Sequence, residues 1–561
     1  MIRILAFILT LVLAPLSVRA QDVPMAMNLS RVNDWSAQQP FIDVMKTARR
    51  WIGHKPGQWG GVQYDELEER GLLDENGWPI EIPADLSSIG TLILTDLPED
   101  AAVYAGRYVL SFAGEGIVEV GGGAQNVRYG TGQVTFDFSP GGAVLLKIQR
   151  TDPSRTGDYV RNISVMKQEN AQAWQAGAVF NPDWLRHMEG FEAIRFMNWM
   201  NTNNSTQERW EDRPRLSDFS YSWRGVPLEV MLALANRLNA APWFNMPHLA
   251  DDAYCRAFAR AVSDGLDGGL DVYVEYSNEM WNFQFDQTRW AETQARARWG
   301  REHRFVEHYG MRAAQIAQIW SDVFAAKRDR LINVISTQTG WMGLEKDILE
   351  APLWVAENPE SNAPPHEYFD AYAVTGYFGH ALGTDKRRDL VESWIESSHE
   401  IALQDADGKG LAGEAKEAHI RKHRYDAASE WAAQELYDGS ITEEREGSLA
   451  DLLDRVLPYH VNIARSYDLE MIMYEGGTHV VGTGLQMEAE TLTDFFTHLN
   501  YTPEMGRLYE NLIAGWKNLG VGLFTPYSDV LVPTKSGSWG HLRHLGDDNP
   551  RWRALLQFQQ N

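Results

Sequence analysis

The chain has 561 residues, of which 44% are hydrophobic and 23% charged, the composition of a globular protein with an ample core that is too long for one minimal domain. Its formal net charge of −26 repels phosphate backbones and argues against nucleic acid as a partner. The same charge disfavours strongly anionic polysaccharides unless a local basic patch outweighs the mean. Cys255 is the only cysteine, so an intrachain disulfide is excluded and stability must come from packing.

The first twenty residues have the features of a signal peptide rather than of a folded element. Arg3 supplies a short basic region, residues 4–16 form an apolar core, and residues 18–20 give a small-x-small cleavage site. The apolar core is too short to span a membrane as an anchor. No cysteine directly follows this core, so a lipid anchor is not expected there. The alternative is a buried first helix. Export without disulfides indicates a periplasmic or secreted bacterial protein.

The next segments predict a barrel that is interrupted early. Residues 25–30 are expected to form a first strand, followed by a helix over residues 41–51. Residues 73–168 then contain short alternating strands about ten residues apart, separated by glycine-rich turns, which indicates an antiparallel β-sandwich. We therefore predict a barrel made of residues 21–72 and 169–561, with residues 73–168 as an inserted domain.

From about residue 185 the pattern alternates strand and helix, which is typical of parallel β/α units. Helices are expected over residues 227–239 and 307–327, and a charge-rich helical excursion, which would shape the cleft wall, between residues 380 and 468. With residues 25–30 as the first strand, the count reaches eight and predicts an α/β fold, a (β/α)8 TIM barrel. The other seven strands are expected at 193–197, 242–246, 272–276, 331–336, 371–375, 470–474 and 520–524.

Two glutamates follow strands that lie on opposite sides of such a barrel. Glu279, in Ser277-Asn278-Glu279, follows the fourth strand, and Glu475 follows the seventh. The carboxyl ends of barrel strands carry catalytic groups, so the two carboxylates are expected to face each other across the mouth. Glycoside hydrolysis needs such a pair: about 5–5.5 Å apart in retaining enzymes and about 6.5–9.5 Å in inverting ones.

The Asn-Glu pair after strand four and the Glu after strand seven resemble the clan A retaining glycoside hydrolases, the 4/7 superfamily, and family 5 in particular. The resemblance covers roughly residues 25–55 and 170–545. It implies that Glu279 is the acid/base and Glu475 the nucleophile. Family 5 has His-x-Tyr after strand six where this chain has Thr375-x-Tyr377, so the match is to the clan rather than to family 5 itself.

The resemblance also implies residues that bind the substrate or support the carboxylates. Asn278 would bond the sugar 2-hydroxyl, and Arg195 would keep the nucleophile ionised. Tyr377 would bond the nucleophile, and we expect it to lower the pKa of Glu475 together with Arg195. Trp539 would be the platform under the sugar at the cleavage site, and His248 matches a histidine of the family.

Each of these residues also has a structural interpretation. The glutamates can be helix N-terminal charges, and Arg195 can pair with a structural acid. His248 can pack in the interior. Tyr377 and Trp539 can belong to the cleft wall.

Other classes of function fit less well. Scattered histidines argue against a metal-dependent hydrolase, the Gly-x-Ser-x-Gly motif is absent, and no cofactor is expected. The rival hypothesis is a non-catalytic carbohydrate-binding protein on a glycosidase-like scaffold. A polysaccharide or oligosaccharide is the expected partner, with the glycan and the linkage open, and a monomer is the default.

Overall fold

A computed structural model of the chain describes residues 23–559, so the predicted signal peptide lies outside the described residues. Within this range, parallel strands form one sheet in which each strand lies beside the next one of the barrel sequence. Hydrophobic runs ending in polar residues, such as Val272–Tyr276, form these strands because both faces of the sheet are covered. The strands are β1 (Ala26–Asn28), β11 (Ala193–Arg195), β12 (Ala241–Met246), β13 (Val272–Tyr276), β14 (Leu331–Ser336), β15 (Ala371–Phe378) and β16 (Glu470–Thr478).

An eighth segment closes the sheet into a barrel. Ala26 N donates to Phe524 O (2.9 Å) on one side, and Met473 N donates to Leu523 O (2.8 Å) on the other. The segment forms only isolated bridges instead of the strand predicted over residues 520–524. Glycine weakens a strand and proline cannot donate to the ladder, and this segment contains Gly522 and Pro526. The closed arrangement confirms the (β/α)8 barrel.

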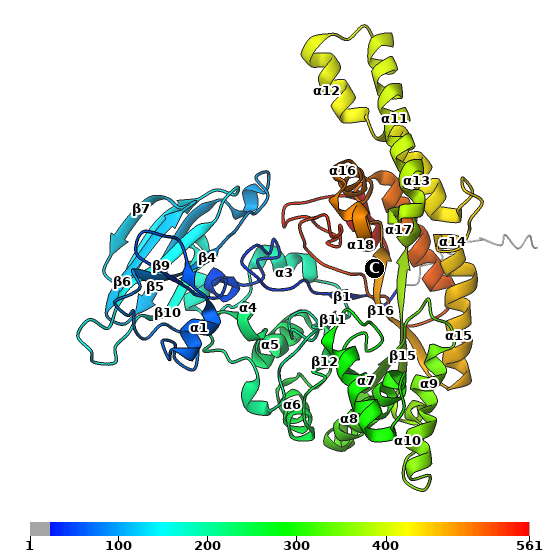
Figure 1. Cartoon of the computed structure of the whole chain (residues 1–561), viewed down its shortest axis with the longest axis horizontal. Coiled ribbons are helices and arrows are strands. Elements are labelled where there is room, and N and C mark those ends of the chain that lie inside the picture. Colours follow the sequence, from blue (N-terminus) through cyan, green and yellow to red (C-terminus); the bar gives the residue numbers. More distant parts are fainter. Residues whose placement is uncertain (1–22, 560–561) are drawn as a thin grey trace, which may run out of the picture.

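Helices cover the outside of the barrel (Figure 1). The two predicted helices are confirmed as α5 and α8. In α5, Asn239 adopts a left-handed conformation (φ 53°) that ends the helix. The helices around the barrel are α3 (Pro182–Met188), α4 (Tyr221–Arg224), α5 (Leu228–Leu238), α6 (Asp252–Gly265), α7 (Asp286–Trp299), α8 (Phe305–Val323), α9 (Leu344–Glu350), α10 (Pro352–Glu357), α15 (Leu457–Ser466), α16 (Glu490–Leu499), α17 (Pro503–Asn518) and α18 (Pro550–Gln559).

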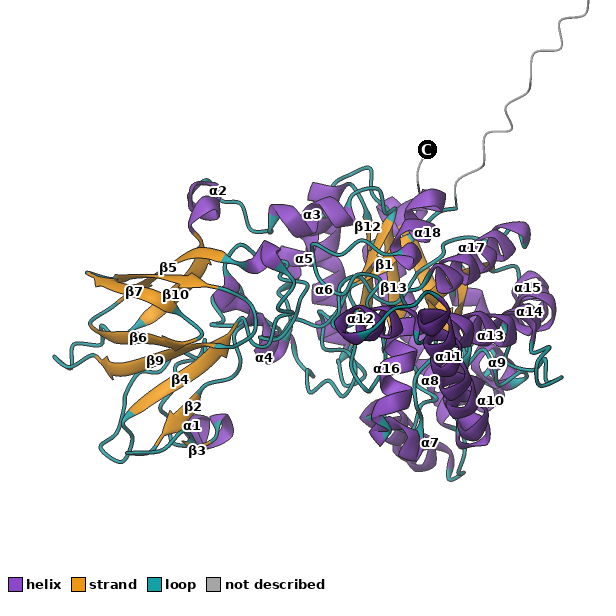
Figure 2. Ribbon diagram, turned by 90° about the horizontal axis from the view of Figure 1, so that it is seen from above, coloured by secondary structure: helices purple, strands orange, loops and turns teal. Residues whose placement is uncertain are grey.

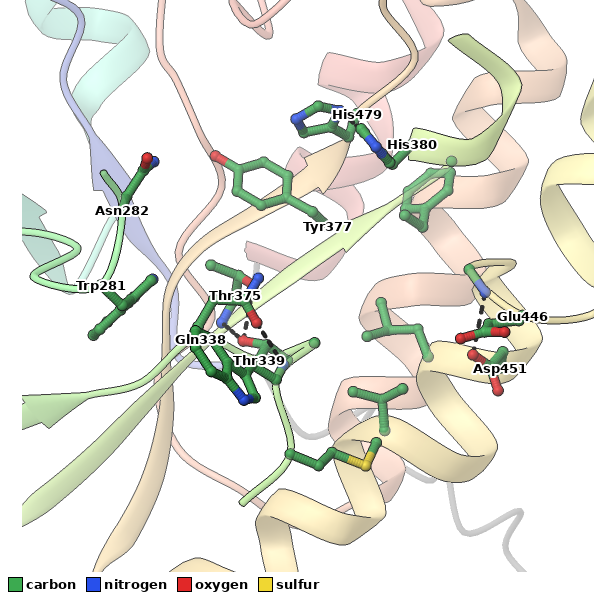
Figure 3. A pocket seen from close by; sticks show the side chains of 18 of the residues that line it. Trp281, Asn282, Gln338, Thr339, Thr375, Tyr377, His380, Glu446, Asp451 and His479 are labelled. Atoms are coloured by element: carbon green, nitrogen blue, oxygen red, sulfur yellow. Dashed lines mark hydrogen bonds between the residues drawn. The ribbon is translucent and has the colours of Figure 1, made fainter. Parts of the chain in front are cut away.

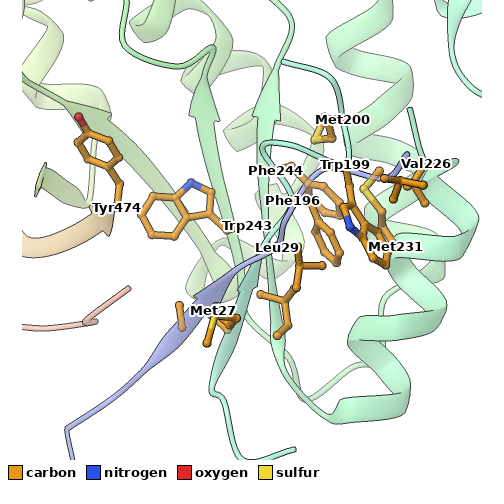
Figure 4. Close-up of a cluster of buried hydrophobic side chains, with 14 of the residues drawn as sticks. Met27, Leu29, Phe196, Trp199, Met200, Val226, Met231, Trp243, Phe244 and Tyr474 are labelled. Carbon is orange, nitrogen blue, oxygen red and sulfur yellow. The ribbon is translucent and has the colours of Figure 1, made fainter. Parts of the chain in front are cut away.

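Large apolar side chains fill the space between the first barrel strands and their helices. Phe196 stacks on Phe244 with ring centroids 5.6 Å apart, and Trp199 packs on Phe196 at 5.7 Å. Figure 4 shows this cluster with Trp243 between it and Tyr474. The rigid packing fixes the positions from which the ends of the strands project.

An antiparallel β-sandwich is inserted between β1 and β11, as predicted (Figure 2). Its core is built by alternation, with Val134, Phe136 and Phe138 buried along one strand. One sheet has the order β10 (Arg161–Lys167), β5 (Gly106–Ala113), β8 (Gln133–Phe138), β7 (Gln125–Gly130). The other has the order β3 (Gly61–Val62), β2 (Ile52–His54), β4 (Ser88–Ile93), β9 (Val144–Thr151), β6 (Gly116–Gly122).

The start of the insert differs from the sequence analysis in two respects. Strands β2 and β3 belong to the sandwich although they precede residue 73. The helix expected over residues 41–51 is wrong, because only a short 3-10 helix, Val44–Thr47, forms there. Asp43 caps that turn at Met45 N (3.1 Å) and also accepts from Val165 N of β10 (2.8 Å), which directs the chain into the sandwich.

Aromatic side chains hold the sandwich against the barrel. Trp51 packs on Phe219 with ring centroids 5.5 Å apart, and Tyr64 packs on Trp223 at 5.6 Å. Tyr64 begins α1 (Tyr64–Glu69) of the insert, whereas Phe219 and Trp223 come from the long loop after β11 and from α4. The second helix of the insert, α2 (Ala171–Gln175), leads back toward the barrel.

The predicted excursion lies between β15 and β16. It contains α11 (Arg388–Gly408), α12 (Gly413–His423), α13 (Asp426–Asp438) and α14 (Leu449–Asp451). Figure 1 shows α11 and α12 projecting away from the barrel, and α12 has no buried residue. Among the helices of residues 23–559, none is long and apolar enough to cross a membrane.

Candidate active site

Glu475 lies near the carboxyl end of β16 and is 6% exposed. Three donors hold its carboxylate. Arg195 Nη1 (2.9 Å) and Asn28 Nδ2 (3.3 Å) donate to Oε1, and the Tyr377 hydroxyl donates to Oε2 (3.0 Å). These donors come from β11, β1 and β15, so the closed barrel brings them together around one carboxylate.

Arg195 is fully buried and connects both sides of the site. Its Nη2 donates to Glu275 Oε2 (2.9 Å) and to Asn278 Oδ1 (3.0 Å). The guanidinium lies over the rings of Trp243 and Tyr474, at 5.3 and 5.2 Å from their centroids. A guanidinium with two carboxylates and two aromatic faces cannot rotate freely, so it fixes the Oε1 edge of the Glu475 carboxylate.

Glu279 stands at the end of a tight turn after β13. Ser277 and Glu279 both have positive φ values, 59° and 43°, which are costly for residues other than glycine. The turn is held by Ser277 N, which donates to Met246 O (2.8 Å). The Tyr474 hydroxyl (3.2 Å) and Asn282 Nδ2 (2.9 Å) donate to the Glu279 carboxylate. Strained backbone of this kind is typical of functional sites.

Glu279 opens into a cleft of about 1000 Å³. Figure 3 shows Tyr377, Trp281 and Asn282 on one side of it and Glu446 and Asp451 on the other. The second wall comes from residues 446–456 of the excursion, which confirms that the excursion shapes the cleft. Part of this wall is a π-helical turn, Leu452–Val456. Single π-turns of this kind are frequent at functional sites.

The pKa of the Glu475 carboxyl is raised to about 7, chiefly by burial; the nearby charge of Glu279 also raises it, while Arg195 and the Tyr377 hydroxyl lower it. The expectation that Arg195 and Tyr377 give a lowered pKa is therefore wrong. The two donors act in the expected direction, but the loss of water around the carboxylate outweighs them. The influence of Glu279 also places the two carboxylates within electrostatic reach of each other.

Of the substrate-binding residues proposed from the sequence, Arg195, Asn278 and Tyr377 lie in this network. Trp539 lies beside it, with its ring centroid 6.0 Å from that of Tyr377. His248 is separate. It lines another cavity, of about 520 Å³, with Trp290 and Arg312, and burial lowers its pKa to about 4.

Sequence reasoning missed several residues that the site depends on. Glu275 is buried and accepts from Arg195, Asn245 Nδ2 (2.7 Å), Trp243 Nε1 (3.1 Å) and Ser336 Oγ (2.8 Å). The sequence contained one indication of its importance, because Glu275 is a charged residue within the apolar run of residues 272–276. Tyr474 carried no signal, because tyrosine is common in strands. Asn28 is of a type that strands disfavour, but its role depends on Glu475, 447 positions away.

Within residues 23–559, no group of three or more His, Cys, Asp or Glu side chains is placed to hold a metal ion.

Comparisons with known proteins give no family assignment. No family model and no curated protein matches the chain. Among solved structures, the chain is similar to a fungal β-1,4-galactanase, with 11% identity, a TM-score of 0.31, and 69% of this chain and 96% of that chain covered. It is also similar to the GH51 arabinofuranosidase from Xanthomonas axonopodis pv. citri, with 8% identity and a TM-score of 0.35. This match covers 68% of this chain and 66% of that chain. A third similar structure is the GH5-4 broad specificity endoglucanase from Clostridium longisporum, with 12% identity and a TM-score of 0.29. This match covers 65% of this chain and 94% of that chain. These neighbours are glycoside hydrolases, but likenesses this weak carry no argument about the reaction.

Proposed function

We propose that the protein is a retaining glycoside hydrolase that cleaves β-linked polysaccharides or oligosaccharides by double displacement. The observation that carries the proposal is the placement of two carboxylates at the ends of β13 and β16. One of them, Glu475, is held by Arg195 and Tyr377, and the other, Glu279, opens into a large cleft. Two carboxyl groups in unlike surroundings are the arrangement that glycoside hydrolysis requires.

Glu475 is the nucleophile in this proposal. In the first step its carboxylate attacks the anomeric carbon while Glu279 protonates the departing glycosidic oxygen, which leaves a glycosyl ester on Glu475. In the second step Glu279 takes a proton from water, which attacks the same carbon and frees Glu475.

The neighbours of Glu475 support its role as nucleophile. Arg195 and Asn28 hold one carboxylate oxygen and Tyr377 holds the other, so the carboxylate is oriented before the sugar arrives. Asn278, tied to Arg195, would bond the sugar 2-hydroxyl, and Trp539 would pack against the ring of the same sugar. Both of these roles rest on the resemblance to clan A.

The leaving part of the glycan would occupy the cleft beside Glu279. Two aromatic side chains that line it are half exposed, Phe283 at 50% and Trp341 at 54%. Flat apolar faces of this kind pack against sugar rings. The proposal includes a secreted or periplasmic location, a cofactor-free reaction and a monomeric enzyme.

The test is hydrolysis of a panel of β-linked polysaccharides and oligosaccharides by the wild type, Glu279→Ala and Glu475→Ala, with and without azide. Loss of activity in Glu475→Ala, together with a glycosyl azide of retained configuration formed by Glu279→Ala, would support both roles. Two variants that cleave as fast as the wild type would refute the assignment. Glycan binding without cleavage by the wild type would favour the non-catalytic binding protein.

A further inference from the structure

A third cavity, of about 650 Å³, lies where the sandwich meets the barrel. Figure 1 shows α1 and α4, which contribute to its wall, at this junction. The volume lies within the range of small-molecule sites, about 300–1,000 Å³. The barrel contributes Arg31, residues 201, 203–207, 211, 212 and 215, Trp223 and Arg224, and the insert contributes Arg50, Glu68 and Glu75.

This cavity adjoins Asn278 and shares no lining residue with the main cleft. Asn203, in its wall, accepts from Asn278 Nδ2 (3.1 Å) and from Gln287 Nε2 (2.7 Å). Arg31 is three residues beyond Asn28, which bonds Glu475, so their Cα atoms are at most about 11 Å apart. Since Glu279 lines the main cleft, where the leaving group would lie, the cavity beside Asn203 is available for sugars on the other side of the cleaved bond.

Two of the four arginines in this lining, Arg31 and Arg50, lie near each other, and the four acidic side chains of the lining do not pair with Arg31. Arg31 has no carboxylate partner within 4 Å among residues 23–559. Burial and the nearby positive charge of Arg50 lower its pKa, so the two cations lie close enough to repel. The nearest carboxylate of Arg50 is that of Asp65, at 3.7 Å. Two neighbouring cations with so little compensation would gain from an anionic ligand.

The remaining wall suits the hydroxyl groups of a sugar. Glu75 is occupied by Arg215 (3.4 Å), and Asp212 accepts backbone N–H groups of the same loop, the nearest at 2.8 Å. Glu68 and Glu211 remain to accept hydroxyl protons. The Arg224 guanidinium lies 3.6 Å from the centroid of the Trp223 ring and presents a flat surface.

We propose that this cavity is a glycan subsite, shared by the sandwich and the barrel, that binds a sugar carrying a carboxylate. Arg31 and Arg50 bind the carboxylate, and the amide and acidic side chains of the loop after β11 bind the hydroxyls. The inference rests on the proposed function and names its substrate class as an acidic glycan. It also gives the insert a role in recognition.

The test is calorimetric binding to the full chain carrying Glu475→Ala, which prevents turnover. The probes are β-linked oligosaccharides that contain glucuronic or mannuronic acid, each compared with its carboxyl-reduced neutral counterpart. We expect at least one acidic member to bind about tenfold or more tightly than its neutral partner, the effect of one charge-assisted hydrogen bond. Arg31→Met and Arg50→Met should remove this preference. Arg128→Met, on the exposed face of β7, is the matched control and should keep it.

Equal binding of the acidic and neutral members, no binding of any acidic member, or a preference that survives both cavity substitutions would overturn the proposal. These outcomes are separate from the catalytic test. Glu279 and Glu475 variants can lose activity while the charge preference is absent, and the preference can be present in a protein that cleaves nothing.

Discussion

Replacing Glu475 by glutamine should abolish activity and stabilise the folded protein at neutral pH. The glutamine keeps the shape of the side chain. Its oxygen can accept from Arg195 and Asn28, and its amide can donate to the hydroxyl oxygen of Tyr377, which now lies 3.0 Å from Glu475 Oε2. The variant therefore removes the buried charge and the nucleophile while it preserves the surrounding contacts.

The size of the gain follows from the raised pKa of Glu475. A carboxyl whose pKa rises from 4.5 to about 7 on folding makes its ionised form less stable in the folded protein by about 3 kcal/mol. Between these two values the folded protein binds more protons than the unfolded chain, so the stability of the wild type falls as the pH rises. The destabilisation is absent below about pH 4.5 and complete above about pH 7.

Urea unfolding followed by tryptophan fluorescence at pH 5 and pH 8 measures the effect. Glu475→Gln should be more stable than the wild type by up to about 3 kcal/mol at pH 8 and by much less at pH 5. Glu360→Gln, in an exposed loop, is the control and should change neither value. A gain that is equal at the two pH values, or a loss of stability at pH 8, would show that burial does not control this carboxyl.

Three further predictions concern the same network. The pH profile of kcat/KM should have an acid limb with an apparent pKa near 7, from ionisation of Glu475; a limb near pH 4.5 would contradict it. Tyr377→Phe removes a hydrogen bond to the carboxylate, so kcat/KM should fall about 10- to 100-fold and the acid limb should move to higher pH; an unchanged limb would exclude this bond. Arg195→Met leaves Glu275 and Glu475 without their cation. The free energy of unfolding at pH 8, measured by urea unfolding, should fall by about 3–5 kcal/mol. A fall below about 1 kcal/mol would refute a stabilising role for the ion pairs of Arg195 with these two glutamates.

The barrel was predictable because each of its strands is indicated by a short run of neighbouring residues. A run such as residues 272–276, buried on both faces and followed by a polar turn, is recognisable without knowledge of its neighbours. The eighth segment was harder, because it forms only bridges that its neighbours on both sides complete. The helix expected over residues 41–51 failed for a similar reason: Asp43 binds Val165, a contact that becomes visible only when the sandwich is folded.

The site was predictable only in part, since its supporting residues are defined by long-range contacts. Glu279 and Glu475 stand out because charged residues end apolar strands. Glu275 lies inside such a strand, and its meaning depends on Arg195, 80 positions away. Chain order also cannot show that His248 faces a different cavity, because its direction is set by the packing of Trp290. The balance of burial against hydrogen bonding at Glu475 likewise needs the folded barrel.

The closing contacts of the barrel determine when the protein can become active during its synthesis. Ser30 N donates to Asp529 Oδ1 (2.8 Å) across 499 positions, next to the bridge that joins Asn28 to Tyr527. The first strand thus leaves the ribosome long before its partner exists, and contacts this distant in sequence form slowly. Asn28, which supports Glu475, is part of that first strand. A chain released before its last tenth is made should therefore remain an open, inactive sheet, with exposed edges that a chaperone would have to protect.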